Sequence, residues 1–87
     1  MLAKEIIDKL LRIASKKNLI NIKSVSLEVG SIALAHNGLS KHVEDTTIEN
    51  LEFGLRNIAK NTILENTKFS ISKIPGEHWK IKDIVVE

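Results

Sequence analysis

Two histidines beside acidic residues are the first side chains whose types and spacing could do chemistry. His36 and His42 lie six residues apart around an Asn37-Gly38 turn signal, and Glu44 and Asp45 follow closely. Imidazole and carboxylate groups are common metal ligands, so these residues suggest a metal site carried by a loop. Their spacing lacks the regularity of ligands fixed on one rigid element, which favours solvated loop residues instead. We keep His36, His42 and Glu44 as candidate metal ligands.

A third histidine, His78, follows the sequence Ile74-Pro75-Gly76. A metal at His78 would need ligands from another segment or another chain, so we interpret this residue as part of a turn and keep it as a weaker candidate ligand.

Four serines alternate with apolar residues in two strand-like runs, so their hydroxyl groups are expected on exposed faces. The sequence places no general base beside them, and a serine nucleophile needs one. We therefore predict no catalytic site and no enzymatic activity. The four serines are Ser24, Ser26, Ser70 and Ser72.

The chain has no cysteine, which excludes disulfides, thiolate zinc sites and thiol nucleophiles. We accordingly expect no zinc. No apolar run approaches the roughly 18 residues of a membrane span, and the first twelve residues are amphipathic, unlike a signal peptide. The expected location is the cytoplasm, without membrane association.

Helical periodicity marks the two segments expected to form helices. Apolar residues recur at steps of three and four from residue 2 to 17, and Asn18 suits a left-handed stop. A second helix is expected after Thr46 and Glu49, which have the spacing of a capping box, and should end near Asn61. Phe53 falls off the apolar stripe of this helix, so we expect it to face a partner or a second contact.

Alternating apolar residues mark three strands. The first ends at Gly30, the second runs from Lys68 to Ile74, and the third from Trp79 to Val86. The run Ile84-Val85-Val86 breaks the alternation, which fits a strand covered on both faces or one that carries a bulge.

The resulting order is helix, strand, helix, strand, strand. We predict a single α+β domain, residues 1–87, in which two helices pack on one face of a three-stranded sheet. Such a small domain buries a modest core, so a homodimer or a partner surface would be a natural supplement.

Composition argues against nucleic-acid binding. The net charge is +2, and only three aromatic residues, Phe53, Phe69 and Trp79, are available for stacking on bases. A small nucleic-acid binder is therefore the last of the function classes that we consider.

The order and spacing of four blocks resemble the HypA/HybF family of hydrogenase and urease nickel-incorporation proteins. Each block alone is mostly an apolar pattern, but together they span nearly the whole chain. The Pro-Gly that follows the second strand is the most specific feature. The blocks are Val25–Gly30, Leu51–Thr62, Phe69–Gly76 and Trp79–Glu87.

The resemblance implies a nickel-binding domain of this element order, with a protein client or a partner GTPase. It also implies a zinc domain after the Pro-Gly and a nickel chelate at an N-terminal Met-His-Glu. Here Glu77 and His78 alone separate Gly76 from Trp79, and the chain starts Met1-Leu2-Ala3, without those nickel ligands. We therefore expect nickel binding to be weak or lost.

Three further positions have open interpretations. Glu28 is either the solvent face of its strand or a partner contact, and Trp79 is either a core anchor or an interface anchor. Lysines of the last two strands, expected as neighbours, could form a basic stripe, which we interpret as a solvated sheet face. These lysines are Lys68, Lys73, Lys80 and Lys82.

Three functions follow as hypotheses. The first is a HypA-like accessory protein for maturation of a nickel enzyme, which acts mainly by docking to protein. The second is a metal-free, homo-oligomeric interaction module that uses an exposed edge or the region of Phe53. The third is the nucleic-acid binder. We favour the first as family assignment and the second as mechanism, since a fold carries no function without its site.

Overall fold

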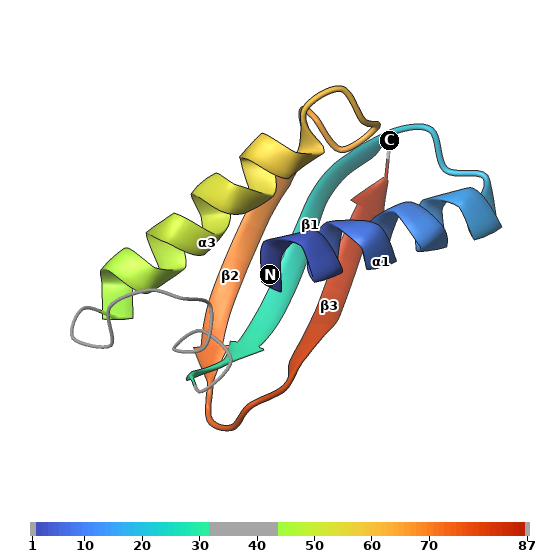
Figure 1. Ribbon diagram of the computed structural model, residues 1–87. Coiled ribbons are helices and arrows are strands. Elements are labelled where there is room, and N and C mark those ends of the chain that lie inside the picture. The colour runs from blue at the N-terminus through green and yellow to red at the C-terminus, as the bar shows by residue number, and fades with distance from the viewer. Residues whose placement is uncertain (1, 32–43, 87) are drawn as a thin grey trace.

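Two helices lie on one face of a three-stranded sheet in the computed structural model, which describes residues 2–31 and 44–86 (Figure 1). The elements are α1 (Leu2–Lys17), β1 (Ile22–Gly30), α3 (Glu44–Ala59), β2 (Lys68–Ile74) and β3 (Trp79–Val86). In Figure 1, α3 runs along the β2 side of the sheet and α1 crosses the side of β1 and β3. The predicted α+β class and element order are confirmed.

Helix α1 has the predicted bounds and ends in a Schellman motif. The amide of Leu19 donates to the carbonyl oxygen of Ala14 at 2.8 Å, and the amide of Asn18 donates to Ser15 at 3.3 Å. Asn18 has a φ of 56°, as its left-handed stop requires. The buried face of α1 consists of Leu2, Ala3, Ile6, Ile7, Leu10 and Ala14.

Helix α3 begins at Glu44, so the prediction that Thr46 starts it as a capping residue is wrong. The helix ends at Ala59, and Asn61, near the predicted end, has a φ of 65°.

The strand order is β2-β1-β3, with β1 in the centre. Strands β1 and β2 are parallel, and α3 provides the long crossover that parallel neighbours need. Strands β1 and β3 are antiparallel. The prediction that the lysines of β2 and β3 lie on neighbouring strands is therefore wrong, because β1 lies between those strands.

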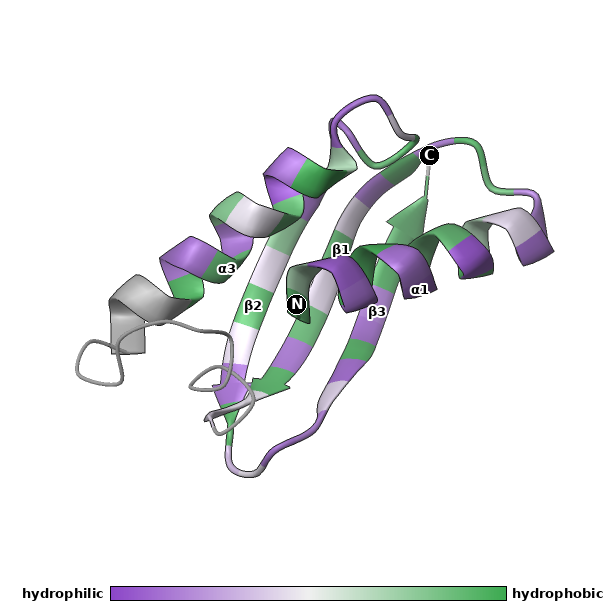
Figure 2. Ribbon diagram, viewed as in Figure 1, coloured by the Kyte–Doolittle hydropathy of each residue, from purple (hydrophilic) through white to green (hydrophobic). Residues whose placement is uncertain are grey.

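The sheet has one apolar face and one polar face, and Figure 2 shows the alternation along its strands. Val25, Leu27 and Val29 of β1 are fully buried beneath the helices. Ser24, Ser26 and Glu28 alternate with them and therefore point to the opposite face.

The connection from β2 to β3 crosses the end of β1. The amide of Gly30, the last residue of β1, donates a hydrogen bond of 2.7 Å to the carbonyl oxygen of His78. A Cβ on Gly30 would lie 2.3 Å from the carbonyl oxygen of Gly76, so only glycine fits beneath this connection. Gly76 itself has a φ of 105°, which also favours glycine.

Strand β3 carries a bulge. Ser26 pairs with Asp83 and Leu27 pairs with Ile81, so Lys82 is an extra residue on β3. Of the two explanations for the broken alternation, the bulge is confirmed. The strand is not covered on both faces, since Val85 and Val86 are 42% and 47% exposed.

Candidate functional site

The candidate metal ligands are not gathered into a site in the part of the chain that the structure describes. His36 and His42 lie outside those residues, and Glu44 is the first residue of α3. His78 is exposed in the connection between β2 and β3. Among residues 2–31 and 44–86, no group of three or more His, Cys, Asp or Glu side chains could hold a metal ion.

The start of α1 does not fit the nickel chelate that the resemblance implies. Leu2 and Ala3, which stand where the family motif has histidine and glutamate, are 8% and 0% exposed and belong to the core. Their side chains are apolar and carry no donor atom for a metal, and nickel favours nitrogen ligands such as imidazole. No step of a proposed function can therefore depend on these two side chains as ligands.

The two predicted partner-binding residues lie on different layers of the molecule. Phe53 is 65% exposed on α3, whereas Leu51 and Leu55 of the same helix are fully buried. Glu28 lies on the polar face of the sheet, where its carboxylate pairs with the ammonium group of Lys80 at 3.3 Å. Phe53 and Glu28 therefore do not form one binding surface.

The four serines lie on the polar face of the sheet. Ser26 is the register partner of Ser70, and Glu28 is the register partner of Ser72. On β3, Asp83 is the register partner of Ser26. Glu28 is paired with Lys80, and no hydrogen bond joins Asp83 or Glu28 to a serine hydroxyl in the described part of the chain. The arrangement provides no nucleophile with an activating base and orienting group.

A groove of about 590 Å³ separates α1 from the edge strand β3, and we call it the edge groove. From α1 it is lined by Lys9, Ile13 and Lys17, and from β3 by Trp79, Lys80, Ile81 and Ile84. It thus has an apolar floor and a basic rim. No acidic side chain is among the described residues that line it.

The edge groove exists because the helices cover β1 completely and β3 incompletely. Trp79, Ile81 and Ile84 are the register partners of Val29, Leu27 and Val25. The three β1 residues are 0% to 1% exposed, whereas their β3 partners are only partly buried against the core. Apolar surface that the fold itself leaves partly open is available to another molecule.

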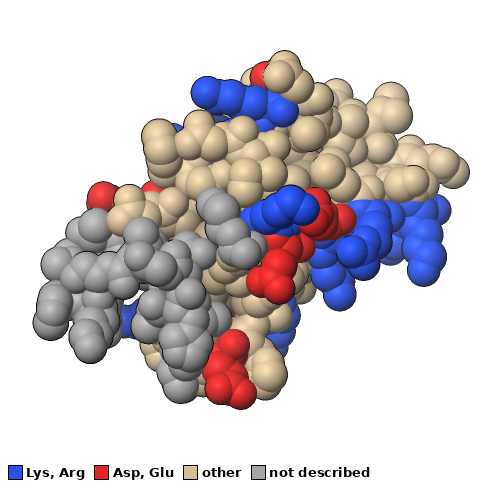
Figure 3. Space-filling model, viewed as in Figure 1, with Lys and Arg blue, Asp and Glu red and all other residues tan. Residues whose placement is uncertain are grey.

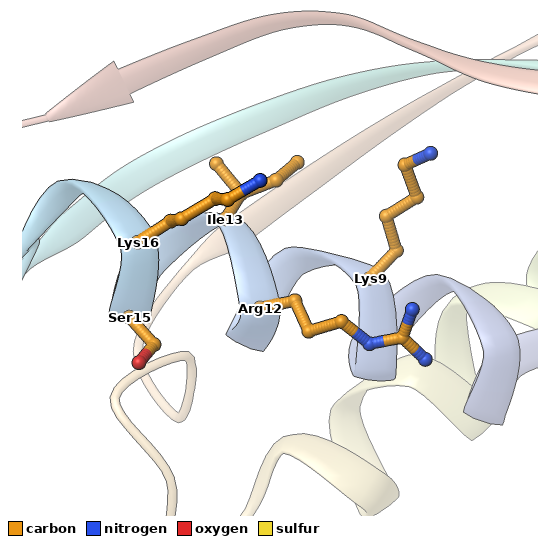
Figure 4. A pocket seen from close by; sticks show the side chains of 5 residues that line it. All are labelled: Lys9, Arg12, Ile13, Ser15 and Lys16. Carbon is orange, nitrogen blue, oxygen red and sulfur yellow. The ribbon is translucent and has the colours of Figure 1, made fainter.

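The rim is continuous with further basic residues on α1. Lys9, Arg12, Ile13, Ser15 and Lys16 line a shallow hollow of about 400 Å³. In Figure 4, Lys9, Ile13 and Lys16 extend toward the strands, Arg12 runs along the helix, and Ser15 points the other way. Figure 3 shows basic side chains gathered on the right of this face, where α1 lies in Figure 1.

Four basic residues of this region make no ion pair with another described residue. Lys4 pairs with Asp8 on α1, Arg56 pairs with Glu52 on α3, and Lys80 pairs with Glu28 on the polar face of the sheet. None of these ion pairs includes Lys9, Arg12, Lys16 or Lys17. These four cations are therefore available to an acidic partner.

Comparison with known proteins does not assign the chain to a family: no family model matches it, and a search of curated proteins finds no match. No helix within residues 2–31 and 44–86 is both long enough and apolar enough to cross a membrane.

Sequence reasoning missed the edge groove, although its α1 side leaves a signal. Lys9, Ile13 and Lys17 follow one another at steps of four, which places an apolar residue between two lysines on one helix face. The part of the groove that β3 lines could not be predicted without the strand order, because Trp79, Ile81 and Ile84 would be interior residues if β3 were the central strand.

Proposed function

We propose that this protein is a docking module that binds a protein partner and carries no nickel on the side chains of Leu2 and Ala3. The edge groove is the observation that carries this proposal, because it joins partly exposed apolar residues to lysines that make no ion pair with another described residue, beside an edge strand. Apolar surface supplies most of the affinity of protein interfaces, and charge supplies orientation and selectivity.

The resemblance to the HypA/HybF family supports a partner from nickel-enzyme maturation. The partner would be a hydrogenase-type or urease-type client, or the GTPase that works with it. The element order of the chain agrees with the order that the resemblance implies. In this role the protein holds or orients the client, and the metal comes from elsewhere.

A complex with such a partner is the direct test. The purified full-length protein is mixed with the precursor of a nickel-hydrogenase large subunit, or with a maturation GTPase, and the mass of the eluted species is measured by light scattering. We expect a complex of fixed stoichiometry that forms equally with added nickel or with a chelator. A folded protein of similar size and charge is the control partner. A complex that needs nickel, or no complex with either partner, would contradict the proposal.

Self-association is a second candidate function, favoured by apolar residues at one end of the sheet. Ile20 is 84% exposed and precedes β1, whose first residue pairs with Val86, itself 47% exposed. Val85 is 42% exposed beside it. Light scattering over a wide concentration range would show dimers in the parent protein and monomers in Ile20→Asp. A monomer at every concentration would remove this candidate.

A further inference from the structure

The edge groove has the chemistry to bind an acidic segment in extended conformation. We propose that a peptide adds as a strand to the free edge of β3 and that its groove-facing side chains, which are every second residue, are apolar over the groove floor and acidic beside Lys9 and Lys17. This inference rests on the proposed docking function and names the chemistry of the partner.

The free edge of β3 favours a strand over a helix as the occupant. Strand β3 pairs with β1 on one side, and within the described residues no strand pairs with its other side. An edge strand presents a row of backbone donors and acceptors, and an added strand satisfies them. The eight residues Trp79–Val86 offer room for a peptide of similar length.

The floor of the groove matches a strand with apolar residues at every second position. Trp79 and Ile81 point to the same side of β3, and Ile84 continues that side beyond the bulge at Lys82. Ile13 of α1 closes the groove opposite them. A partner strand that places its apolar side chains in this layer would complete the cover that α1 leaves open over β3.

The lysine rim selects the charge of the occupant. Lys9 and Lys17 of α1 border the groove on the same side of the sheet as its floor, and carboxylates at groove-facing positions of the partner strand would neutralise them. The ammonium group of Lys80 pairs with Glu28 on the opposite, polar face of the sheet, so Lys9 and Lys17 supply the charge that faces the occupant. A second copy of this chain that added its own β3 would bring more lysines to the rim, which disfavours pairing between copies.

The apolar floor of the edge groove also favours a peptide over a nucleic acid as the occupant. Trp79 is the one aromatic side chain in the groove, and its other floor residues are aliphatic. Aliphatic side chains pack against apolar side chains of a peptide, whereas single-stranded nucleic acid needs stacking surfaces along its length. An RNA oligonucleotide is therefore a competitor in the test.

The test uses the full chain and the synthetic peptide Glu-Ser-Val-Ser-Ile-Ser-Glu, in which the glutamate, valine and isoleucine side chains all lie on one face of an extended strand. Trp79 is the single tryptophan, so its fluorescence reports directly on the groove. We expect saturable binding with a blue shift of the emission and a steep decrease in affinity with salt. A peptide with lysine in place of glutamate, and one with proline at its centre, should bind at least tenfold more weakly, because they reverse the charge or block strand pairing.

Two double variants separate local from overall charge. Lys9→Glu with Lys17→Glu should weaken peptide binding at least tenfold. Lys60→Glu with Lys68→Glu makes the same change in net charge at exposed positions on α3's side of the molecule and should alter affinity less than twofold. Circular dichroism of both variants verifies that they fold.

Several results would overturn the inference: no peptide binding, equal binding of the proline peptide, equal losses in the two double variants, or displacement of the peptide by an RNA oligonucleotide of equal length. Dimers of the chain that compete with the peptide would assign the groove to a second copy.

Two results separate this inference from the proposed function. If a maturation partner binds the Lys9→Glu, Lys17→Glu variant as tightly as the parent, the docking function is supported but the edge groove is not its binding site. If the peptide binds but neither maturation partner does, the edge groove is supported as a peptide-binding site and the proposed class of client protein is contradicted.

Discussion

The amide of Gly30 donates a 2.7 Å hydrogen bond to the carbonyl oxygen of His78, which ties the end of the central strand to the connection that passes over it. This contact explains how a connection of four residues, 75–78, can lead from β2 to β3 although β1 lies between them. The connection stays short because it rests directly on the backbone of Gly30. It also fixes where β3 begins, and hence where Trp79 enters the edge groove.

Gly30→Ala should destabilise the protein by about 2–3 kcal/mol, in the upper part of the range for overpacked sites. The added Cβ would lie 2.3 Å from the oxygen and 2.7 Å from the carbon of the Gly76 carbonyl group, so backbone must move. Urea unfolding measures the change. Ser26→Ala, on the polar face of the same strand, is the control and should change stability by less than about 0.5 kcal/mol. An unchanged midpoint for Gly30→Ala would contradict the close approach.

Thr67→Val should cost about 1–2 kcal/mol, because it removes a buried hydrogen bond. The Thr67 hydroxyl donates to the carbonyl oxygen of Ile22 at 2.7 Å and thereby joins the segment before β2 to the start of β1. Thr67→Ser keeps the hydroxyl and should lose much less stability. Thermal unfolding of the two variants compares them directly, and equal losses would show that the hydroxyl contributes little.

Phe53→Ser and Leu55→Ala should differ sharply although the residues are two positions apart on α3. Phe53 is 65% exposed, so its replacement should change the free energy of unfolding by less than about 0.5 kcal/mol. Leu55 is fully buried, and its truncation should cost about 2–5 kcal/mol. Denaturant titration gives both values. If Phe53→Ser also abolished binding of a maturation partner, the docking surface would lie on α3 and not in the edge groove.

Calorimetric titration with nickel should give no stoichiometric binding at micromolar concentration. Leu2 and Ala3 are buried and lack donor atoms, so the ligand set implied by the resemblance is incomplete. Tight binding that disappears in the variant with His36→Ala and His42→Ala would contradict this expectation and assign a metal role to those histidines. Tight binding that persists in the variant would place the metal on other groups of the chain.

Much of the fold could be predicted because local patterns carry it. The bounds of α1, the end of β1 at Gly30 and both later strands follow from periodicity and stop signals. The start of α3 was not predicted in this way, because a capping box is a short pattern of two residues, and Thr46 and Glu49 have its spacing inside a helix that begins at Glu44.

The candidate site was less accessible to sequence reasoning. Phe53 is exposed, which is one of the two alternatives that the helical stripe left open, and its expected role in binding stays a prediction. The pairing of Lys80 with Glu28 could not be predicted, since the two residues lie 52 positions apart and meet only because β1 and β3 are antiparallel neighbours. The incomplete cover of β3 likewise depends on where α1 lies across the sheet.

The sequence alone determined which segments form helices and strands and which of their faces are apolar, because these properties depend on neighbours within one or two turns or on alternate residues. Only the tertiary structure decided the strand order β2-β1-β3, because pairing depends on packing between distant segments. That order buries Val25, Leu27 and Val29 completely and leaves their partners on β3 partly exposed. The edge groove, and with it the proposed partner, therefore follows from the position of β3 at the edge of the sheet.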